Sequence, residues 1–138
     1  MPERVAIYVE GAPTAFGHFS QVIKFGNSLH ISGQLPIDST TGRLVSADME
    51  PQVRQVFKNL TTILQACAGQ ASNVMSVRIY LIDLRDHKVL DDISKEVFFF
   101  TPPARTVLQV VALPFGARVM IDAIAELNPV EMSAKKLF

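Results

Sequence analysis

Three places in the sequence carry side chains that could bind a small carboxylate and act on it. Arg105 stands just after two prolines, at the start of an apolar run, and its guanidinium could hold a carboxylate through two parallel hydrogen bonds. Asp122 is a single acid within the apolar stretch VMIDAIA, where a carboxylate must be paired, protonated or functional. Ser32 and Gly33 lie at the end of a predicted strand and offer a hydroxyl and an approachable backbone N–H.

These residues would suit the hydrolysis of a carboxylate substrate. Arg105 would hold the anion, and Asp122 would position or deprotonate a water molecule. A structural alternative remains open, because Arg105 and Asp122 could form an ion pair between neighbouring strands of a final hairpin. The sequence contains no GxSxG, GxGxxG, P-loop or HExxH motif, so the familiar sites of other enzyme classes are not expected.

The composition predicts a single cytoplasmic domain. A chain of 138 residues is long enough for one core but not for two, so residues 1–138 should form one domain. The 13 basic residues balance 13 acidic ones, which argues against nucleic acid or an anionic membrane as a partner. One cysteine and three scattered histidines exclude an internal disulfide and predict no metal site. The chain begins without a signal-peptide pattern.

The elements that must position these side chains follow the order β-β-β-α-β-α-β-β, which is typical of an α+β domain. One helix is predicted between Asp48, a plausible N-cap, and Gly69, because apolar residues recur there every three or four positions. A second helix is predicted over residues 86–100, and residues 36–44 read as a turn. Strands are predicted at residues 4–10, 22–25, 29–32, 75–84, 104–113 and 117–127.

The predicted sheet has more apolar surface than its helices could cover. The last two strands read as apolar on both faces, whereas an antiparallel sheet usually leaves one face in water. Two helices suffice for one face only. With 49% hydrophobic and 19% charged residues, the chain is therefore expected to pack its second sheet face on another copy of itself.

Several segments, taken in order, resemble the RidA family, the YjgF-type reactive intermediate deaminases. These segments are FSQVIKFGNSLHISGQLPID, VRQVFKNLTTILQACAG, VRIYLIDLRD and PPART…ALPFGARVMIDAIA, within residues 19–126. The resemblance implies a chorismate-mutase-like fold, with a mixed six-stranded sheet and two helices on one face. It also implies a homotrimer with a central barrel, whose clefts between subunits hydrolyse enamines and imines without a metal or an organic cofactor.

The resemblance assigns roles to residues of this chain. Arg105 matches the arginine that holds the substrate carboxylate, and Ser32 and Gly33 match residues that line the same cleft. The implied reaction converts 2-imino acids, such as 2-iminobutanoate, 2-iminopropanoate or its enamine 2-aminoacrylate, to 2-oxo acids and ammonia. Two alternatives remain: a related hydrolase of another substrate such as 2-aminomuconate, or a non-catalytic trimer that binds small carboxylates.

Four positions of the implied cleft depart from the family pattern. Phe19 stands where the family often has Tyr, and Val107 where it often has Cys. Asp122 stands where Glu is usual, which shortens the acid by one methylene and would place a bound water differently. Asp91 stands where Asn is common, and its carboxylate would oppose an anionic substrate if it pointed into the cleft.

Overall fold

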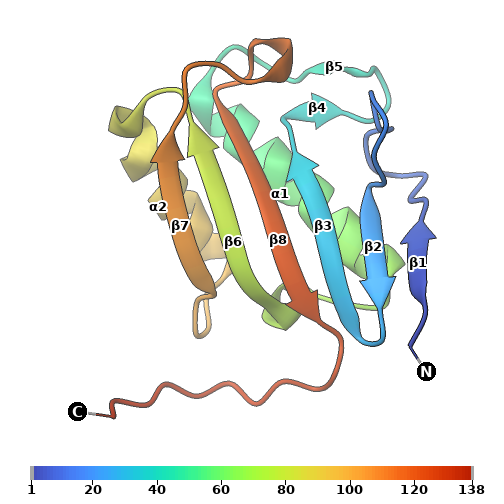
Figure 1. Ribbon diagram of the computed structural model, residues 1–138. Helices are drawn as coiled ribbons and strands as arrows, with labels where there is room; N and C mark the ends of the chain where they lie inside the picture. Colours follow the sequence, from blue (N-terminus) through green and yellow to red (C-terminus); the bar gives the residue numbers. More distant parts are fainter. Residues whose placement is uncertain (1, 138) are drawn as a thin grey trace.

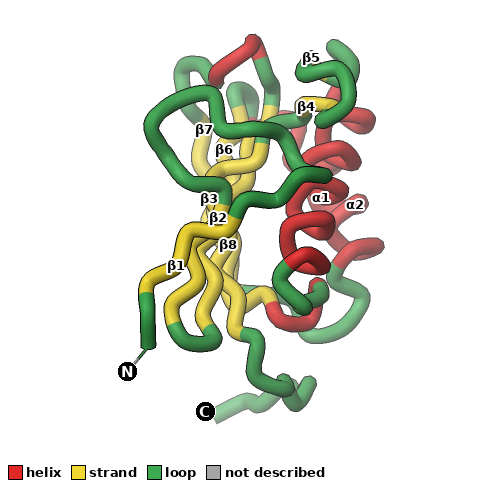
Figure 2. The backbone as a smooth tube through the Cα atoms, turned by 90° about the vertical axis from the view of Figure 1, so that its right-hand side faces the viewer, coloured by secondary structure: helices red, strands yellow, loops and turns green. Residues whose placement is uncertain are grey.

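The computed structural model describes residues 2–137 as a six-stranded sheet with two α-helices on one face, and a small two-stranded sheet beside it (Figures 1 and 2). The elements are β1 (Arg4–Ile7), β2 (Val22–Phe25), β3 (Ser28–Gln34), β4 (Ile37–Asp38), β5 (Arg43–Leu44), α1 (Met49–Ala66), β6 (Val74–Leu81), α2 (His87–Val97), β7 (Ala104–Gln109) and β8 (Val119–Glu126). This arrangement confirms the predicted α+β class and the mixed sheet. Of the helices in residues 2–137, none is both long and apolar enough to cross a membrane.

The strand order in the large sheet is β1-β2-β3-β8-β6-β7. All neighbours pair antiparallel except β6 and β7, which pair parallel. The prediction of a final hairpin was therefore wrong. Because α2 carries the chain back along the sheet, β7 lies parallel to β6 at the outer edge. The last strand, β8, then enters the gap between β3 and β6 (Figure 1).

The core lies between α1 and one face of the sheet. The apolar stripe of α1 includes Val53, Val56 and Ile63, which are inaccessible to solvent. Every second residue of β8 from Val119 onward is buried against it, and the intervening residues lie on the open face. The strand therefore alternates in burial, and its open face also carries the apolar Met120 and Ile124, which agrees with the prediction that it is apolar on both faces. Ile124 still exposes 41% of its surface on the open face, so packing on a second copy stays a prediction.

Residues 36–44 form a short hairpin, β4 and β5, where only a turn was predicted. Ile37 pairs with Leu44, and Gly42 closes the turn with a left-handed φ of 71°, a conformation that glycine adopts without strain. Asn59 of α1 donates hydrogen bonds of 3.0 Å to the carbonyl groups of Leu35 and Ile37. The hairpin is thus attached to the helix, which a reading of local turn residues could not anticipate.

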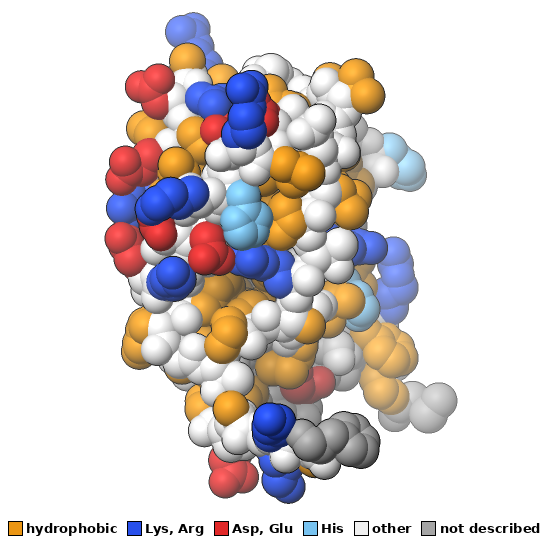
Figure 3. Space-filling view, turned by 90° about the vertical axis from the view of Figure 1, so that its left-hand side faces the viewer, with side chains coloured by type: hydrophobic (Ala, Val, Ile, Leu, Met, Phe, Trp, Pro, Cys, Tyr) orange, Lys and Arg blue, Asp and Glu red, His pale blue; other side chains and the backbone are white. Residues whose placement is uncertain are grey.

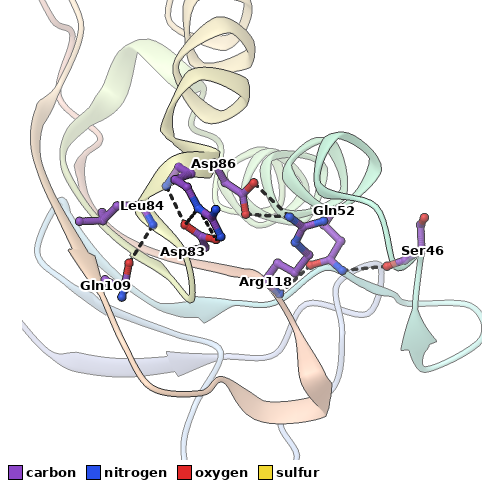
Figure 4. A network of polar contacts seen from close by, with 8 residues as sticks. Ser46, Gln52, Asp83, Leu84, Asp86, Gln109 and Arg118 are labelled. Atoms are coloured by element: carbon purple, nitrogen blue, oxygen red, sulfur yellow. Dashed lines mark hydrogen bonds and ion pairs between the residues drawn. The ribbon is translucent and has the colours of Figure 1, made fainter.

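A partly buried polar network joins the starts of α1, α2 and β8 (Figure 4). Gln52 is fully buried; its amide donates to the Ser46 carbonyl and its oxygen accepts from the Arg118 backbone N–H, both at 2.8 Å. The Arg118 guanidinium makes two hydrogen bonds to Asp86, at 3.0 and 2.9 Å. Because buried polar groups cost stability when unpaired, this network fixes the ends of the elements that carry Asp91 and Asp122.

Candidate active site

Arg105 lies on the edge strand β7 with its side chain on the helix side of the sheet, because its register partner is the buried Val77. Its Nη1 donates to Asp91 Oδ1 at 2.8 Å, and its Nη2 lies 3.3 Å from His87 Nε2. The side chains of Arg105 and Asp91 are 31% and 34% exposed. Arg105 therefore has a carboxylate partner in its own chain, but the contact uses one oxygen and is partly solvated.

The partners of Arg105 come from one face of α2. His87, Asp91 and Lys95 are spaced four residues apart, so they lie along the same side of the helix. The hydrogen bond from Arg105 lowers the pKa of Asp91, and the charges of Arg105, Lys95 and His87 lower it further. Asp91 points toward Arg105, where its carboxylate would oppose an anionic substrate. The contact of His87 with Arg105 was missed, although the four-residue spacing of His87 from Asp91 was a usable signal.

A cavity of about 500 Å³, here called the edge cavity, lies beneath Arg105 between α2, β6 and the segment before β7. Its lining consists of Phe57, Val77, Ile79, Asp91, Ser94, Lys95, Phe98, Phe100, Pro102, Pro103 and Arg105. The rings of Phe57 and Phe98 meet edge to face at 5.8 Å. Figure 3 views this side of the molecule and shows acidic and basic side chains gathered above an apolar region.

Asp122 and Arg105 of one chain point to opposite faces of the sheet. Asp122 is in register with Arg78 on β6, whereas Arg105 is in register with Val77, one residue earlier. In addition, β6 separates β7 from β8. The suggested ion pair between Arg105 and Asp122 was therefore wrong, because adjacent strand residues project to opposite sides.

Asp122 is held by two donors from β6. Its Oδ1 accepts from Arg78 Nε and its Oδ2 accepts from Tyr80 Oη, both at 2.9 Å. Its side chain is only 16% exposed. Burial raises the pKa of Tyr80, and the hydrogen bond to Asp122 raises it further. Arg78 and Tyr80 were missed, since their two-residue spacing has meaning only once β6 is known to pair with β8.

Ser32 and Gly33 form a bulge in β3. Ile31 pairs with Ala123 and Gln34 with Ile121, so β3 carries one more residue than β8 between these pairs, and the bulge faces Asp122. The Ser32 hydroxyl donates to the Ser20 carbonyl at 2.6 Å. A Cβ at Gly33 would lie 2.8 Å from the sulfur of Met120. Bulges often re-aim side chains beside active sites.

Phe19 lies in the loop that follows β1, beside the bulge. Its ring packs edge to face on Phe16, which packs in the same way on Phe115, with centroid distances of 5.2 and 5.1 Å. These three rings and Gly33 border a cavity of about 170 Å³, here called the loop pocket. The structure thus places Phe19 and Gly33 on the border of one pocket.

The predicted site residues fall into two groups within one chain. One group lies at the β7 edge and contains Arg105, Asp91 and Val107, which packs partly buried against the core. The other surrounds the β3 bulge and contains Phe19, Ser32, Gly33 and Asp122. No cluster of three or more His, Cys, Asp or Glu within residues 2–137 could hold a metal ion.

The fold and the matched segments define a family. Residues 9–127 match the model of the family described as Endoribonuclease L-PSP. The chain therefore belongs to this family, the RidA or YjgF-type proteins that its motifs resemble.

Named relatives agree with this assignment. A RutC family protein of Pyrococcus horikoshii is 40% identical over 119 residues, which cover 86% of this chain and 94% of the relative. A 2-iminobutanoate/2-iminopropanoate deaminase of Mus musculus is 37% identical over 126 residues, covering 91% of this chain and 93% of the relative. The crystal structure of RidA from Psychrobacter sp. PAMC 21119 matches with a TM-score of 0.86 at 37% identity, covering 89% of this chain and 99% of that one.

Proposed function

We propose that this protein hydrolyses 2-imino acids, and the enamines in equilibrium with them, to 2-oxo acids and ammonia. The single observation that carries the proposal is an arginine at the mouth of an apolar cavity, held in its own chain by one carboxylate oxygen. Relatives of this chain are named as 2-iminobutanoate/2-iminopropanoate deaminases, which supports the same reaction here.

In this proposal the substrate carboxylate takes the place of Asp91 on Arg105. A guanidinium has five N–H donors, and Asp91 accepts from one of them. Ion pairs that are about one third exposed, as this one is, contribute on the order of 0–1 kcal/mol. A substrate that binds two parallel N–H groups would gain more than that, so exchange is favourable.

The water-activating group in the proposal is Asp122. Because Arg105 and Asp122 of one chain point to opposite faces, both reach one substrate only where two copies meet. We therefore place the reaction at a boundary between subunits of a homotrimer. One copy would contribute Arg105, and its neighbour would contribute Asp122 with the Ser32–Gly33 bulge. Leu108 and Ile124, which are 44% and 41% exposed on the open face, give such an assembly apolar surface to bury.

The proposed reaction requires the protein mainly to orient the substrate and the water molecule and to transfer protons. The iminium carbon is already electrophilic, so a water molecule adds to it while Asp122 accepts one of the water protons. Asp122 then returns this proton to the nitrogen of the carbinolamine, the carbon–nitrogen bond breaks, and the hydroxyl proton passes to the departing ammonia as the carbonyl forms. Each turnover consumes one water and returns the proton borrowed by Asp122.

The proposal is tested by generating 2-iminobutanoate in situ from threonine with a dehydratase and following the release of ammonia. The wild-type protein should accelerate release over buffer, and Arg105→Ala should lose that acceleration. Arg43→Ala removes an exposed arginine on β5 and serves as the control that retains it. No acceleration by the wild type for any 2-imino acid would contradict the proposal, and 2-oxobutanoate binding without turnover would indicate a carboxylate-binding protein instead.

A further inference from the structure

From the edge cavity we infer a substrate class: 2-imino acids with a bulky apolar side chain, which the cavity receives while Arg105 holds the carboxylate. This inference rests on the proposed function and deepens it. The cavity of about 500 Å³ falls in the range of small-molecule sites, roughly 300–1,000 Å³. It is far larger than the ethyl or methyl group of 2-iminobutanoate or 2-iminopropanoate requires.

The polarity of the edge cavity changes from its interior to its mouth. Aromatic and aliphatic side chains line the interior, among them Phe98, Phe100 and Ile79. Ser94 is the one uncharged polar side chain among the described lining residues, and its hydroxyl already donates to the Leu90 carbonyl at 2.8 Å. The interior therefore suits a hydrocarbon group and offers no free partner for a second polar group.

Charged groups gather at the mouth of the cavity. Arg105 and Lys95 are cationic, and Asp91 lies between them, 2.8 Å from Arg105 Nη1 and 3.6 Å from Lys95 Nζ. A protonated 2-imino acid carries both a carboxylate and an iminium nitrogen. Arg105 suits the first, and Asp91, once displaced from Arg105, suits the second. The pattern fits a zwitterionic head with an apolar tail better than a dicarboxylate, whose second charge would enter the apolar interior at a high cost.

The loop pocket does not compete for this role. Its volume is about 170 Å³, and none of its described lining residues is charged. It borders Gly33 and Phe19, which in the proposed assembly approach the substrate from the neighbouring subunit. The edge cavity is therefore the space that decides which side chains are accepted.

The test compares binding of two product acids by calorimetry: 2-oxobutanoate, and 4-methyl-2-oxopentanoate, which has two more carbons in its side chain. Burying two more methylene-sized groups should make the second acid bind at least about tenfold more tightly. Ser94→Leu fills the cavity from the helix surface and should remove this preference. Ser94→Ala removes the same hydroxyl without filling the space, so it should keep the preference.

Turnover is measured separately, with imines generated from leucine and from 2-aminobutanoate by an amino-acid oxidase. The imine of leucine should show the higher kcat/KM in the wild type, and Ser94→Leu should reverse the order. Equal affinities for the two oxo acids, or an unchanged preference in Ser94→Leu, would overturn the inference while the deaminase proposal stands. Failure to hydrolyse either imine would overturn the deaminase proposal, and the substrate assignment with it, even with the affinity difference present.

Discussion

Two arginine–aspartate pairs lie on opposite faces of the same sheet and differ in how firmly they are held. Asp122 accepts from both Arg78 and Tyr80 and is 16% exposed. Asp91 accepts from Arg105 through one oxygen, and both side chains are about one third exposed, at 34% and 31%. A carboxylate with two donors in a partly buried position keeps its orientation, whereas a single solvated contact exchanges easily.

This difference matches the two tasks of the proposed reaction. A water molecule must be oriented by a group that does not move, and displacements of about 1 Å can cost on the order of a hundredfold in rate. A substrate carboxylate, by contrast, needs a cation that can change partner. Asp122 is one methylene shorter than the glutamate usual in the family, and its two donors on β6 hold the shorter side chain in place.

Asp122→Asn should have the largest effect, because it removes the proton acceptor from the firmly held pair. We expect kcat for imine hydrolysis to fall by roughly 10²–10⁴-fold, the usual contribution of a general base. Ammonia release with saturating imine measures this. Asp122→Glu keeps a carboxylate and should retain more activity than Asp122→Asn. If Asp122→Asn were as active as the wild type, Asp122 would have no part in the reaction.

Arg105→Lys should have the next largest effect, since it keeps the positive charge but loses the planar guanidinium that donates two parallel hydrogen bonds. Losing one charge-assisted hydrogen bond to the substrate should raise KM by about 10–100-fold. Kinetics of 2-iminobutanoate hydrolysis would show this increase. An unchanged KM would mean that Arg105 acts only as a distant charge or not at all.

Tyr80→Phe loosens the firmly held pair without removing its acid. Asp122 then loses one of its two donors, and the free energy of unfolding should fall by about 1 kcal/mol, as measured by urea denaturation. Tyr8→Phe is the matched control, because Tyr8 is exposed and its hydroxyl should contribute nothing measurable. Equal stability of the two variants would contradict the view that Tyr80 fixes Asp122.

Asp91→Asn breaks the exchangeable pair and should help carboxylate binding. With its competitor gone, Arg105 should bind 2-oxobutanoate up to about fivefold more tightly, the equivalent of about 1 kcal/mol. Asp92→Asn is the control, because Asp92 pairs with Lys88 at 2.8 Å instead. Weaker binding by Asp91→Asn than by Asp92→Asn would show that Asp91 assists the ligand rather than competing with it.

The smallest expected effect is the pH dependence of the stability that the Arg105–Asp91 ion pair contributes. Arg105 lowers the pKa of Asp91 in the folded protein, while the unfolded value is about 3.9. The stabilisation by this pair is therefore fully present above about pH 4 and is lost as the pH falls through the lowered pKa of Asp91. The difference in Tm between wild type and Asp91→Asn should shrink over that range. A difference that stays constant with pH would show that it has another origin.

The sequence predicted local structure well, because the signals are local. The three- and four-residue periodicity of α1, the adjacent strands β2 and β3, and the helix before the two prolines were all found. The β4–β5 hairpin was missed, since it depends on Asn59 reaching across from α1. Asp48 does precede α1, but its side chain makes no capping hydrogen bond.

Strand order was the main failure, and it explains what was missed in the site. Nothing local shows that β8 pairs with β6 rather than β7, because this depends on how α2 crosses the sheet. The placement of Arg105 and Asp122 on opposite faces, and the contacts of Asp122 with Arg78 and Tyr80, follow from that pairing. The motif resemblance still made Arg105 a candidate for binding the substrate carboxylate, because a resemblance does not depend on strand order.

The central claim is that Arg105 exchanges Asp91 for a substrate carboxylate at a subunit boundary. A crystal structure of the protein with bound 2-oxobutanoate tests this most directly. The account predicts that both carboxylate oxygens accept from the Arg105 guanidinium, that Asp91 has moved away, and that Asp122 of a neighbouring copy faces the 2-oxo carbon. Arg105 still paired with Asp91 while the acid binds elsewhere would contradict it.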